Sequence, residues 1–489
     1  MTTPSRSPGV RPLLAAGASA ILPGLGQWLA GDRRKARILF AIDAVILVVL
    51  LFLLRDRIAV AAAFFRPSML ALMMVGNIAL LAYRVWAADD AYRSAASVGP
   101  SPGRTVGIAA AVVIGAAVLL PHLWFARIDL IQYDLLTSTF DTGGTAAAAS
   151  PATTQASTTV VPGSPDEPST TVIPTTTTLP PPPPWEELDR LNILLLGGDF
   201  GIGRTGIRTD TMMAMSLDPD TGEAAFLQIP RNWTQAPLPD GMGIWDCDCY
   251  PELINELWLA GERFPEAFPG PGAPSENAVK AIASEFLGIP IHYYALVNLD
   301  GFADLIDAIG GVDLYVPARI VDNEYPTLDG GFTRLVIEPG VQHMDGELAL
   351  SYARTRHQDS DYQRMGRQRC VMEAAMEQMS PVDLLRSFDT IAGVIKETVT
   401  TDIPLDLLPE LVTLYPKMDL DEVVSIRFIP PTYHLKYRSD GQRGAIANIE
   451  LVHEHVQLVI NDPERAVIEL GLDDNESCPE PTAEGTVDQ

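Results

Sequence analysis

LNILLLGGDFGIGRTGIRTDTMMAMSL, residues 191–217, together with EAAFLQI (223–229), decides the fold of this chain. LNILLLGG (191–198) is a short continuous apolar run that ends in glycine, which is typical of a buried strand. TMMAMSL (211–217) and EAAFLQI flank the turn sequence Asp218-Pro219-Asp220-Thr221-Gly222, so they predict a hairpin. Because a hairpin joins antiparallel strands, we do not expect a purely parallel sheet.

Strand-like and helix-like patterns alternate downstream of this hairpin. Strands are expected at 291–299, 312–317 and 422–429, and helices at 251–263, 275–287, 300–311, 345–354, 361–379, 381–400, 404–415 and 445–460. The alternation predicts an α/β fold over residues 185–470, a layered α-β-α domain with a mixed central sheet, preceded by a membrane helix region. The acidic residues 471–489 are expected to form a disordered tail.

The first 126 residues are the most apolar part of the chain and form the expected membrane region. Residues 105–125 carry no charge and are long enough to span the hydrocarbon of a bilayer as a helix. Residues 68–83 and 38–54 are two further candidate spans, and Asp43 is interpreted as lying near one end of the latter, at headgroup level.

A fourth apolar segment, 13–30, is interrupted by Pro23 and by glycines, so it either spans, re-enters or lies in the interface. The basic run after it, from Arg33 to Arg37, is expected on the cytoplasmic side. Three full spans then place everything after residue 126 outside the cell, whereas four would need an external N-terminus. Three are preferred, and either count predicts a multi-pass protein of the cell membrane with an extracytoplasmic C-terminal region.

Residues 127–184 are predicted to be an extracytoplasmic linker. From residue 141 this segment is almost entirely Thr, Ser, Ala, Gly, Pro and Val, a composition that cannot bury a core. Its prolines favour an extended, semi-rigid spacer. The tract is either O-glycosylated or an unmodified stalk.

The charge balance limits the kinds of partner. The net charge is −28, from 62 Asp and Glu against 34 Lys and Arg, so the protein repels a phosphate backbone and nucleic acid is not an expected partner. Arginines nevertheless gather in two places. Arg208 and Arg231 lie beside the first strands, and Arg354, Arg356, Arg364, Arg367 and Arg369 lie within one short segment.

Arginine rather than lysine points to a planar anion, because the guanidinium fork matches phosphate oxygens and stays charged. On a helix that begins at residue 361, Arg364, Arg367 and Gln368 share one face. The pattern predicts a phosphate or pyrophosphate ligand. The alternative is a solvated arginine face paired with the many carboxylates.

Two aspartates lie where strands end and begin. Asp199 follows Gly197-Gly198, and Asp210 directly precedes TMMAMSL. Ligand sites of α/β sheets form at such strand ends, and carboxylates beside a polyphosphate are typical of Mg²⁺ sites. The alternative for each residue is a turn or capping aspartate.

The motifs LLLGGDFGIGRTGIRTDTMM, FLQIPRN, LVNLDGFADLIDAIGGVDLYV and GVQHMDGELALSYARTRHQDSDYQRMGRQRCV together resemble the LytR–CpsA–Psr family. The resemblance implies metal-binding roles for Asp199 and Asp210. It implies that Arg231, Arg354, Arg356 and Arg364 are catalytic and that Arg208, Arg367 and Gln368 bind the pyrophosphate. Asn232 and Phe200-Gly201 depart from the family, which commonly has an acidic residue and Ser-Arg at these places.

The resemblance implies transfer of a glycopolymer from a polyprenyl-pyrophosphate carrier at the membrane bilayer to peptidoglycan, assisted by Mg²⁺, on the extracytoplasmic side. Asp359 or Asp361 is a candidate general base or a partner of an arginine, with the second role favoured. Two other functions use the same residues: a pyrophosphatase of polyprenyl diphosphates, and a non-catalytic receptor of polyprenyl phosphate or wall polymer, which includes a transcriptional attenuator.

Four cysteines are present, and they allow one or two disulfides in an oxidising compartment. We predict that Cys370 pairs with Cys247 or Cys249. Such a bridge would close a long loop and stabilise the fold by about 4 to 5 kcal/mol in the chain-entropy view. The Cys247-Asp248-Cys249 segment alone supplies too few ligands for a metal site.

Overall fold

The computed structural model describes residues 11–97, 102–140, 187–199, 206–240, 242, 244–327, 331–355, 361–378, 387–418, 423–437, 444–472 and 478, with only the backbone of Asp199. The chain separates into two compact units, which we call the helical unit (Met1–Thr137 with Leu408–Thr413) and the α/β unit (Ser138–Leu407 with Leu414–Gln489).

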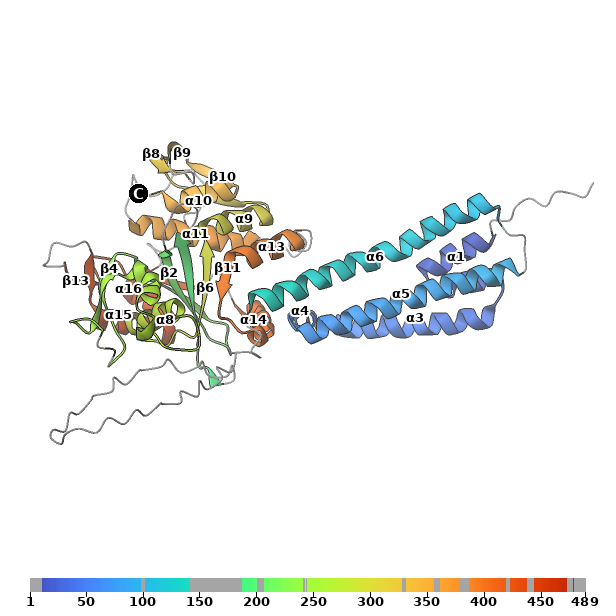
Figure 1. The fold of residues 1–489 in the computed structure, drawn as a ribbon, viewed down its shortest axis with the longest axis horizontal. Coiled ribbons are helices and arrows are strands. Elements are labelled where there is room, and N and C mark those ends of the chain that lie inside the picture. The colour runs from blue at the N-terminus through green and yellow to red at the C-terminus, as the bar shows by residue number, and fades with distance from the viewer. Residues whose placement is uncertain are drawn as a thin grey trace, which may run out of the picture. The chain divides into compact units, whose positions relative to one another are not determined.

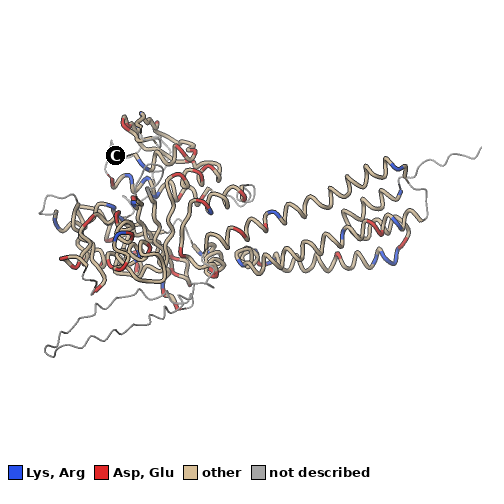
Figure 2. The backbone as a smooth tube through the Cα atoms, in the orientation of Figure 1, with Lys and Arg blue, Asp and Glu red and all other residues tan. Residues whose placement is uncertain are grey.

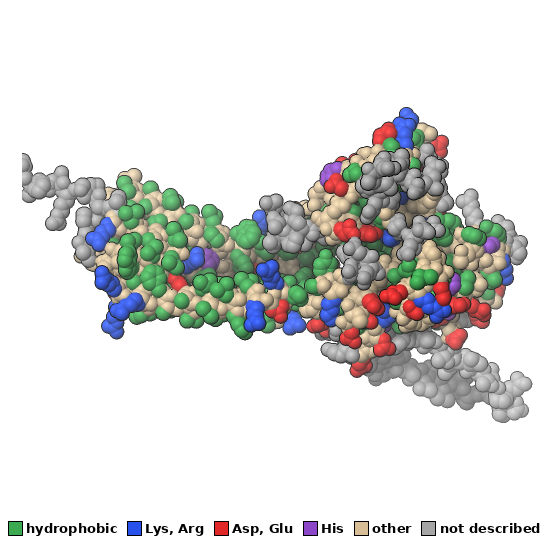
Figure 3. Space-filling model, turned by 180° about the vertical axis from the view of Figure 1, so that it is seen from behind, with side chains coloured by type: hydrophobic (Ala, Val, Ile, Leu, Met, Phe, Trp, Pro, Cys, Tyr) green, Lys and Arg blue, Asp and Glu red, His purple; other side chains and the backbone are tan. Residues whose placement is uncertain are grey.

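Six helices form the N-terminal part of the helical unit. They are α1 (Arg11–Ile21), α2 (Leu25–Ala30), α3 (Arg33–Leu53), α4 (Arg57–Ala63), α5 (Pro67–Ala96) and α6 (Arg104–Thr139). Within the described residues, α3, α5 and α6 are the helices long and apolar enough to cross a membrane, and they contain the three segments expected to do so. Figure 2 shows long stretches of these helices without a charged residue, and Figure 3 shows hydrophobic side chains over their surface.

The interrupted segment 13–30 forms two short helices, α1 and α2, instead of one span. The chain turns at Gly24, where φ is 99°. At Gly26 an added Cβ would lie 2.0 Å from the carbonyl oxygen of Ala15, so only glycine lets α2 pack this closely on α1. Helices of 11 and 6 residues are too short to cross the hydrocarbon layer.

One expectation about the helical unit was wrong. Helix α6 does not end near residue 126 but continues to Thr139, because Gln132, Leu135 and Leu136 extend its buried face at helical spacing. Asp43 lies near the middle of α3, and its Oδ1 accepts a hydrogen bond from the Tyr83 hydroxyl at 3.1 Å. The linker between residues 141 and 186 lies outside the described residues.

The remaining helices are α7 (Leu257–Arg263), α8 (Pro274–Leu287), α9 (Leu299–Ile309), α10 (Gly346–Arg354), α11 (Asp361–Gln378), α13 (Phe388–Thr398), α14 (Leu408–Leu414), α15 (Ile449–Asn461) and α16 (Pro463–Leu470), with short 3-10 helices η2 (Ile254–Glu256), η3 (Pro265–Ala267), η4 (Leu405–Leu407) and η5 (Tyr415–Lys417). The strands are β1 (Leu191–Asp199), β2 (Arg208–Leu217), β3 (Ala224–Gln228), β4 (Trp233–Pro237), β5 (Cys249–Leu253), β6 (Tyr293–Asn298), β7 (Val312–Val316), β8 (Ile320–Pro326), β9 (Phe332–Ile337), β10 (Gly340–Met344), β11 (Val399–Thr401), β12 (Val424–Arg427), β13 (His434–Tyr437) and β14 (Ala445–Ala447).

A six-stranded sheet in the order β11-β6-β1-β2-β3-β12 forms the centre of the α/β unit. β1 runs parallel to β6 and β3 parallel to β12, whereas β2 is antiparallel to both of its neighbours. The mixed α/β fold and the hairpin between β2 and β3 are therefore confirmed. Figure 1 shows α8, α15 and α16 on one side of this sheet and α9, α10 and α11 on another.

Two apolar cores hold these layers. The larger one packs strand residues such as Leu194 and Leu227 against Ile282 and Phe286 of α8 and Val456 of α15. Leu472 belongs to this core, so the segment expected as a disordered tail from residue 471 begins as packed structure. The smaller core joins α9, α10 and α11 to β7 and β10.

Short strands complete the unit, and the sequence predicted only β7 among them. β13, β14, β4 and β5 form a four-stranded sheet in that order, while β7 pairs with β10 and β8 with β9. Residues 249–256, where a helix was expected to begin, instead form β5 and η2. This small sheet matters for the site because β4 begins two residues after Arg231.

Candidate active site

A β-bulge in the central sheet positions Asp210. Gly197 of β1 lies opposite Thr211 of β2, but the next residue, Gly198, lies opposite Thr209. Asp210 is therefore an extra residue in the ladder, and bulges of this kind redirect a side chain away from the regular alternation. An added Cβ on Gly197 would lie 2.9 Å from Cβ and Oγ1 of Thr211, so the close approach at the bulge requires glycine.

The Asp210 carboxylate has two partners from different elements. Oδ2 accepts from Nη1 of Arg231 at 2.6 Å, and Oδ1 accepts from Nδ2 of Asn255 in η2 at 2.9 Å. Burial alone would raise the pKa of Asp210, but Arg231, Asn255 and Arg364 together outweigh it and hold this pKa below the ordinary value. The side chain is therefore an ionised acceptor at neutral pH.

Arg231 joins Asp210 to a second carboxylate at the start of α11. Its Nη2 lies 3.0 Å from Oδ1 of Asp361, and Nη2 of Arg364 lies 3.1 Å from the same oxygen. Asp361 therefore takes the role favoured from the sequence, that of a partner to arginines. The candidate base Asp359 lies outside the described residues.

Arg364 is the most enclosed of these charges. It is 4% exposed, and its Nη2 donates to the backbone carbonyl of Asp210 at 3.1 Å. Its Nε is buried and has no hydrogen-bond partner among the described residues. Burial, and secondarily the charge of Arg231, lower the pKa of Arg364 although Asp361 opposes them, yet an arginine stays protonated at neutral pH. This N–H donor is therefore available to an anionic ligand.

The adjoining ends of β1 and β2 form another part of the site. The backbone of Asp199 pairs with Arg208, two residues from Asp210. The Arg208 side chain is 57% exposed, and its Nε lies 3.3 Å from Oε1 of Glu256 beside Asn255. The two predicted metal aspartates therefore lie at the adjoining ends of the neighbouring strands β1 and β2.

The other predicted residues are not all part of this cluster. Arg367 is buried and donates to the backbone carbonyls of Tyr352 and Thr355, so its hydrogen bonds hold the end of α10. The Arg354 guanidinium lies over the Tyr325 ring, 5.9 Å from its centroid. Gln368 is half-buried on α11, and Arg356 lies outside the described residues.

Two site residues escaped the sequence interpretation. Asn255 lies in η2, and nothing in its local sequence distinguishes it from a surface asparagine. Tyr362 follows Asp361 and interacts through its hydroxyl with Asn232, the residue that departs from the family pattern. Both residues would have been found only by knowing which strands are neighbours.

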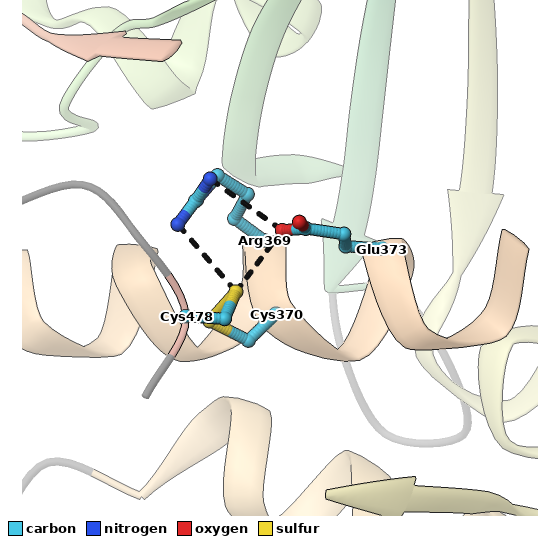
Figure 4. The surroundings of a disulfide bond; sticks show 4 residues. All are labelled: Arg369, Cys370, Glu373 and Cys478. Carbon is cyan, nitrogen blue, oxygen red and sulfur yellow. Dashed lines mark hydrogen bonds and ion pairs between the residues drawn. A yellow bond between two sulfur atoms is a disulfide. The ribbon is translucent and has the colours of Figure 1, made fainter. Parts of the chain in front are cut away.

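The disulfide prediction was wrong. Cys370 pairs with Cys478, and Cys247 pairs with Cys249. Cys370 lies on the face of α11 that belongs to the smaller core, as Cys478 does, whereas the other two cysteines flank a single residue at the start of β5. Figure 4 shows Arg369 and Glu373 of α11 around Cys478, so this bridge fastens the C-terminal segment to the helix that carries Arg364.

Residues 150–443 match the family model of the LytR_cpsA_psr family. The chain belongs to this family. Among curated LytR_cpsA_psr relatives, the polyisoprenyl-teichoic acid–peptidoglycan teichoic acid transferase TagU of Oceanobacillus iheyensis is 34% identical over 233 residues, which are 47% of this chain and 64% of that protein. TagV of Bacillus subtilis, which has the same activity in its name, is 31% identical over 198 residues, 40% of this chain and 45% of that protein.

The chain thus spans less than two thirds of the length of these curated relatives. Among solved structures, the crystal structure of B. subtilis TagV matches with a TM-score of 0.42 and 25% identity, covering 55% of this chain and 96% of that one.

Proposed function

We propose that this protein transfers a glycopolymer from a polyprenyl-pyrophosphate carrier to peptidoglycan by Mg²⁺-assisted phosphoryl transfer. The observation that carries the proposal is the cluster of Asp210, Arg231, Asp361 and Arg364, whose two guanidinium groups meet at one carboxylate oxygen. Buried, mutually paired charges with shifted pKa values are typical of functional sites, and the two arginines favour an anionic ligand.

The hydrogen-bonding capacity of the cluster suits a pyrophosphate. A guanidinium has five N–H donors, and the contacts of Arg231 and Arg364 within the protein use only some of them. The buried Nε of Arg364 in particular requires an acceptor. Arg208 is exposed at the edge of the same site and would bind the outer oxygens.

The residues present also fit a magnesium ion. Mg²⁺ commonly takes one or two carboxylates, with waters and substrate phosphates completing its shell. Asp199 and Asp210 would hold it, since both lie at the adjoining ends of β1 and β2 and the lowered pKa keeps Asp210 ionised. Each carboxylate oxygen of Asp210 has a lone pair beyond the one that accepts from Arg231 or Asn255. When bound, the ion would neutralise charge on the pyrophosphate.

The reaction follows from this arrangement. A sugar hydroxyl of the acceptor attacks the phosphorus next to the glycopolymer, and a new P–O bond forms. The bond from that phosphorus to the bridging oxygen breaks, so polyprenyl monophosphate leaves and takes up the hydroxyl proton through solvent. Arg231 and Arg364 hold the phosphates in line and stabilise charge on the leaving phosphate, which is most of what phosphoryl transfer needs from a protein.

The helical unit supports an anchored enzyme. We propose that α3, α5 and α6 each cross the membrane, with the basic start of α3 on the cytoplasmic side. An odd number of spans then puts the α/β unit outside the cell, where both the lipid carrier and the wall polymer are found.

The test uses the full-length protein in detergent or nanodiscs. The protein is incubated with Mg²⁺, a short-chain polyprenyl-pyrophosphate oligosaccharide and peptidoglycan fragments, and mass spectrometry follows lipid and acceptor. A phosphodiester-linked adduct formed together with polyprenyl monophosphate supports the proposal. Polyprenyl monophosphate without adduct would show that the protein is a pyrophosphatase instead. Lipid that binds but stays unchanged would show that it is a receptor.

A further inference from the structure

An exposed aromatic surface lies beside the arginine cluster. Tyr437, the last residue of β13, is 72% exposed, and Leu435 on the same strand is 58% exposed. The Tyr437 ring packs on His434 with 4.1 Å between ring centroids, so the tyrosine is held in place although it faces solvent. A tyrosine held in this way offers a ligand both an apolar ring face and a hydroxyl group.

The strand register connects this surface to the site. Tyr437 lies opposite Ala445 of β14, and Ala445 lies opposite Trp233 of β4. Two strand spacings amount to about 10 Å, which is the distance of Tyr437 from the strand that begins just after Arg231. The backbone N–H of Ala445 also donates to the carbonyl of Asn232 at 3.4 Å.

Tyr362 interacts with residues of both regions. It directly follows Asp361 in α11, and Nη1 of Arg427 fixes its backbone carbonyl at 2.9 Å. Burial raises the pKa of Tyr362, as do the nearby Asp361 and Tyr437, whereas a hydrogen bond from Asn232 lowers it. Tyr362 thus interacts with Asn232 of the site and electrostatically with Tyr437 of the exposed surface.

We propose that Tyr437, Leu435 and Tyr362 form a sugar-binding surface that holds the glycan strand of peptidoglycan, the acceptor, next to Arg231. This inference rests on the proposed function and adds a subsite to it. Pyranose rings pack their apolar C–H faces on aromatic rings, and the tyrosine hydroxyls offer hydrogen bonds to sugar hydroxyls.

The place of the surface selects the acceptor over the carrier. β13 is the outermost strand of its sheet, so the surface lies at an open edge rather than inside a pocket. A long wall glycan can lie along such an open edge. The carrier lipid, by contrast, needs an enclosed apolar site, since its chain is buried from water.

Two measurements on the full-length protein in nanodiscs test this subsite, each with wild type, Tyr437→Ala and Tyr415→Ala. Tyr415 of η5 is the matched control because it is 58% exposed. The first measurement is cosedimentation with peptidoglycan stripped of its glycopolymers, without any lipid donor. The second is the rate of adduct formation as a function of acceptor and donor concentration.

Loss of one stacking contact is expected to weaken cosedimentation and to raise KM for the acceptor about tenfold in Tyr437→Ala, with KM for the donor and kcat little changed. Tyr415→Ala should behave as wild type. Equal acceptor KM and equal sedimentation in all three proteins overturns the subsite while adduct formation leaves the proposed function intact. A higher KM for the donor alone also overturns it, because the surface would then serve the carrier glycan.

If cosedimentation depends on Tyr437 but no adduct forms, the glycan-binding surface is supported and the proposed transferase activity is contradicted. A Tyr437→Phe variant separates packing from hydrogen bonding, and it should keep most of the binding because it keeps the ring.

Discussion

The guanidinium of Arg231 lies 2.6 Å from Oδ2 of Asp210, although 21 residues separate them in the sequence. The contact arises because β2 and β3 form a hairpin, and the chain leaving β3 returns to the end of the strand where β2 began. The same guanidinium reaches Asp361 on α11. Arg231 thus joins the sheet, the bulge and the helix at the site.

Replacing Arg231 with alanine is expected to lower the rate of adduct formation about 10³-fold, as loss of an arginine that stabilises a phosphoryl-transfer transition state does. Arg231→Lys should recover only part of this, because one ammonium cannot bridge two carboxylates in fixed geometry. Arg465→Ala, which removes an exposed arginine paired with Glu469, is the control. Steady-state rates with a thermal melt for each variant provide the check; an Arg231→Ala protein that melts normally and transfers normally would contradict the assigned role.

Replacing glycine with alanine should have opposite effects at Gly197, which lies at the bulge, and at Gly393, which lies on a helix. Gly197→Ala brings a methyl group within 2.9 Å of Thr211, which should cost about 1 to 3 kcal/mol and displace Asp210. Gly393→Ala, on α13 with open space around it, should raise stability by up to about 1 kcal/mol. Thermal melts and transfer rates of the two variants are the measurement. If Gly197→Ala leaves both unchanged, the bulge does not hold the site.

His292 makes the stability of the α/β unit depend on pH. Its Nδ1 accepts from the backbone N–H of Asn192, which needs a neutral ring, and burial together with nearby Lys280 lowers its pKa to about 4. The unfolded chain takes up this proton near the ordinary histidine value, so the unfolded state binds more protons between about pH 6.5 and 4.

The free energy of unfolding should therefore fall by about 3 kcal/mol in all as pH drops through that window. Above about pH 6.5 the stabilising contribution of neutral His292 should be fully present. Denaturation of wild type and His292→Gln at several pH values measures the slope. The dependence of stability on pH should be flatter for the variant than for wild type between those values. Parallel curves for wild type and His292→Gln would exclude this origin.

The two disulfides should differ in what they contribute. The Cys370–Cys478 bridge closes a loop with a sequence separation of 108, for which the chain-entropy view predicts about 4 to 5 kcal/mol. The Cys247–Cys249 bridge spans a separation of 2 and constrains the unfolded chain little. Double serine variants of each pair, compared by thermal melting, should show a large loss for the first and a small one for the second. Peptide mapping that found either cysteine of one pair joined to the other pair would refute the pairing itself.

Part of this architecture follows from the sequence alone. The apolar run before Gly197 and the turn at Asp218-Pro219 predicted β1 and the hairpin, because their signals are local. The short strands were missed since a segment such as β4, which ends in Pro237, has too few residues for alternation to be visible. Their pairing depends on partners far away in the chain.

The site was predicted in type but not in arrangement. Arg231, Arg364 and Asp210 came together as expected, yet spacing along α11 could not show that Arg367 donates to the carbonyls of α10. Four cysteines allow three pairings, and nothing in their spacing favours the observed one. The bulge at Asp210 was also invisible, since it exists only as a relation between two strands.

That relation has a consequence for how such a protein can change over generations. Gly198 pairs with Thr209 and Gly197 with Thr211, so the residue pairs on both sides of Asp210 form without it. Deleting this one codon would leave an unbroken, regular β2 that keeps its alternation on both sides. The strand would survive while the carboxylate vanished, so a descendant could retain the whole scaffold and lose only its chemistry in a single step.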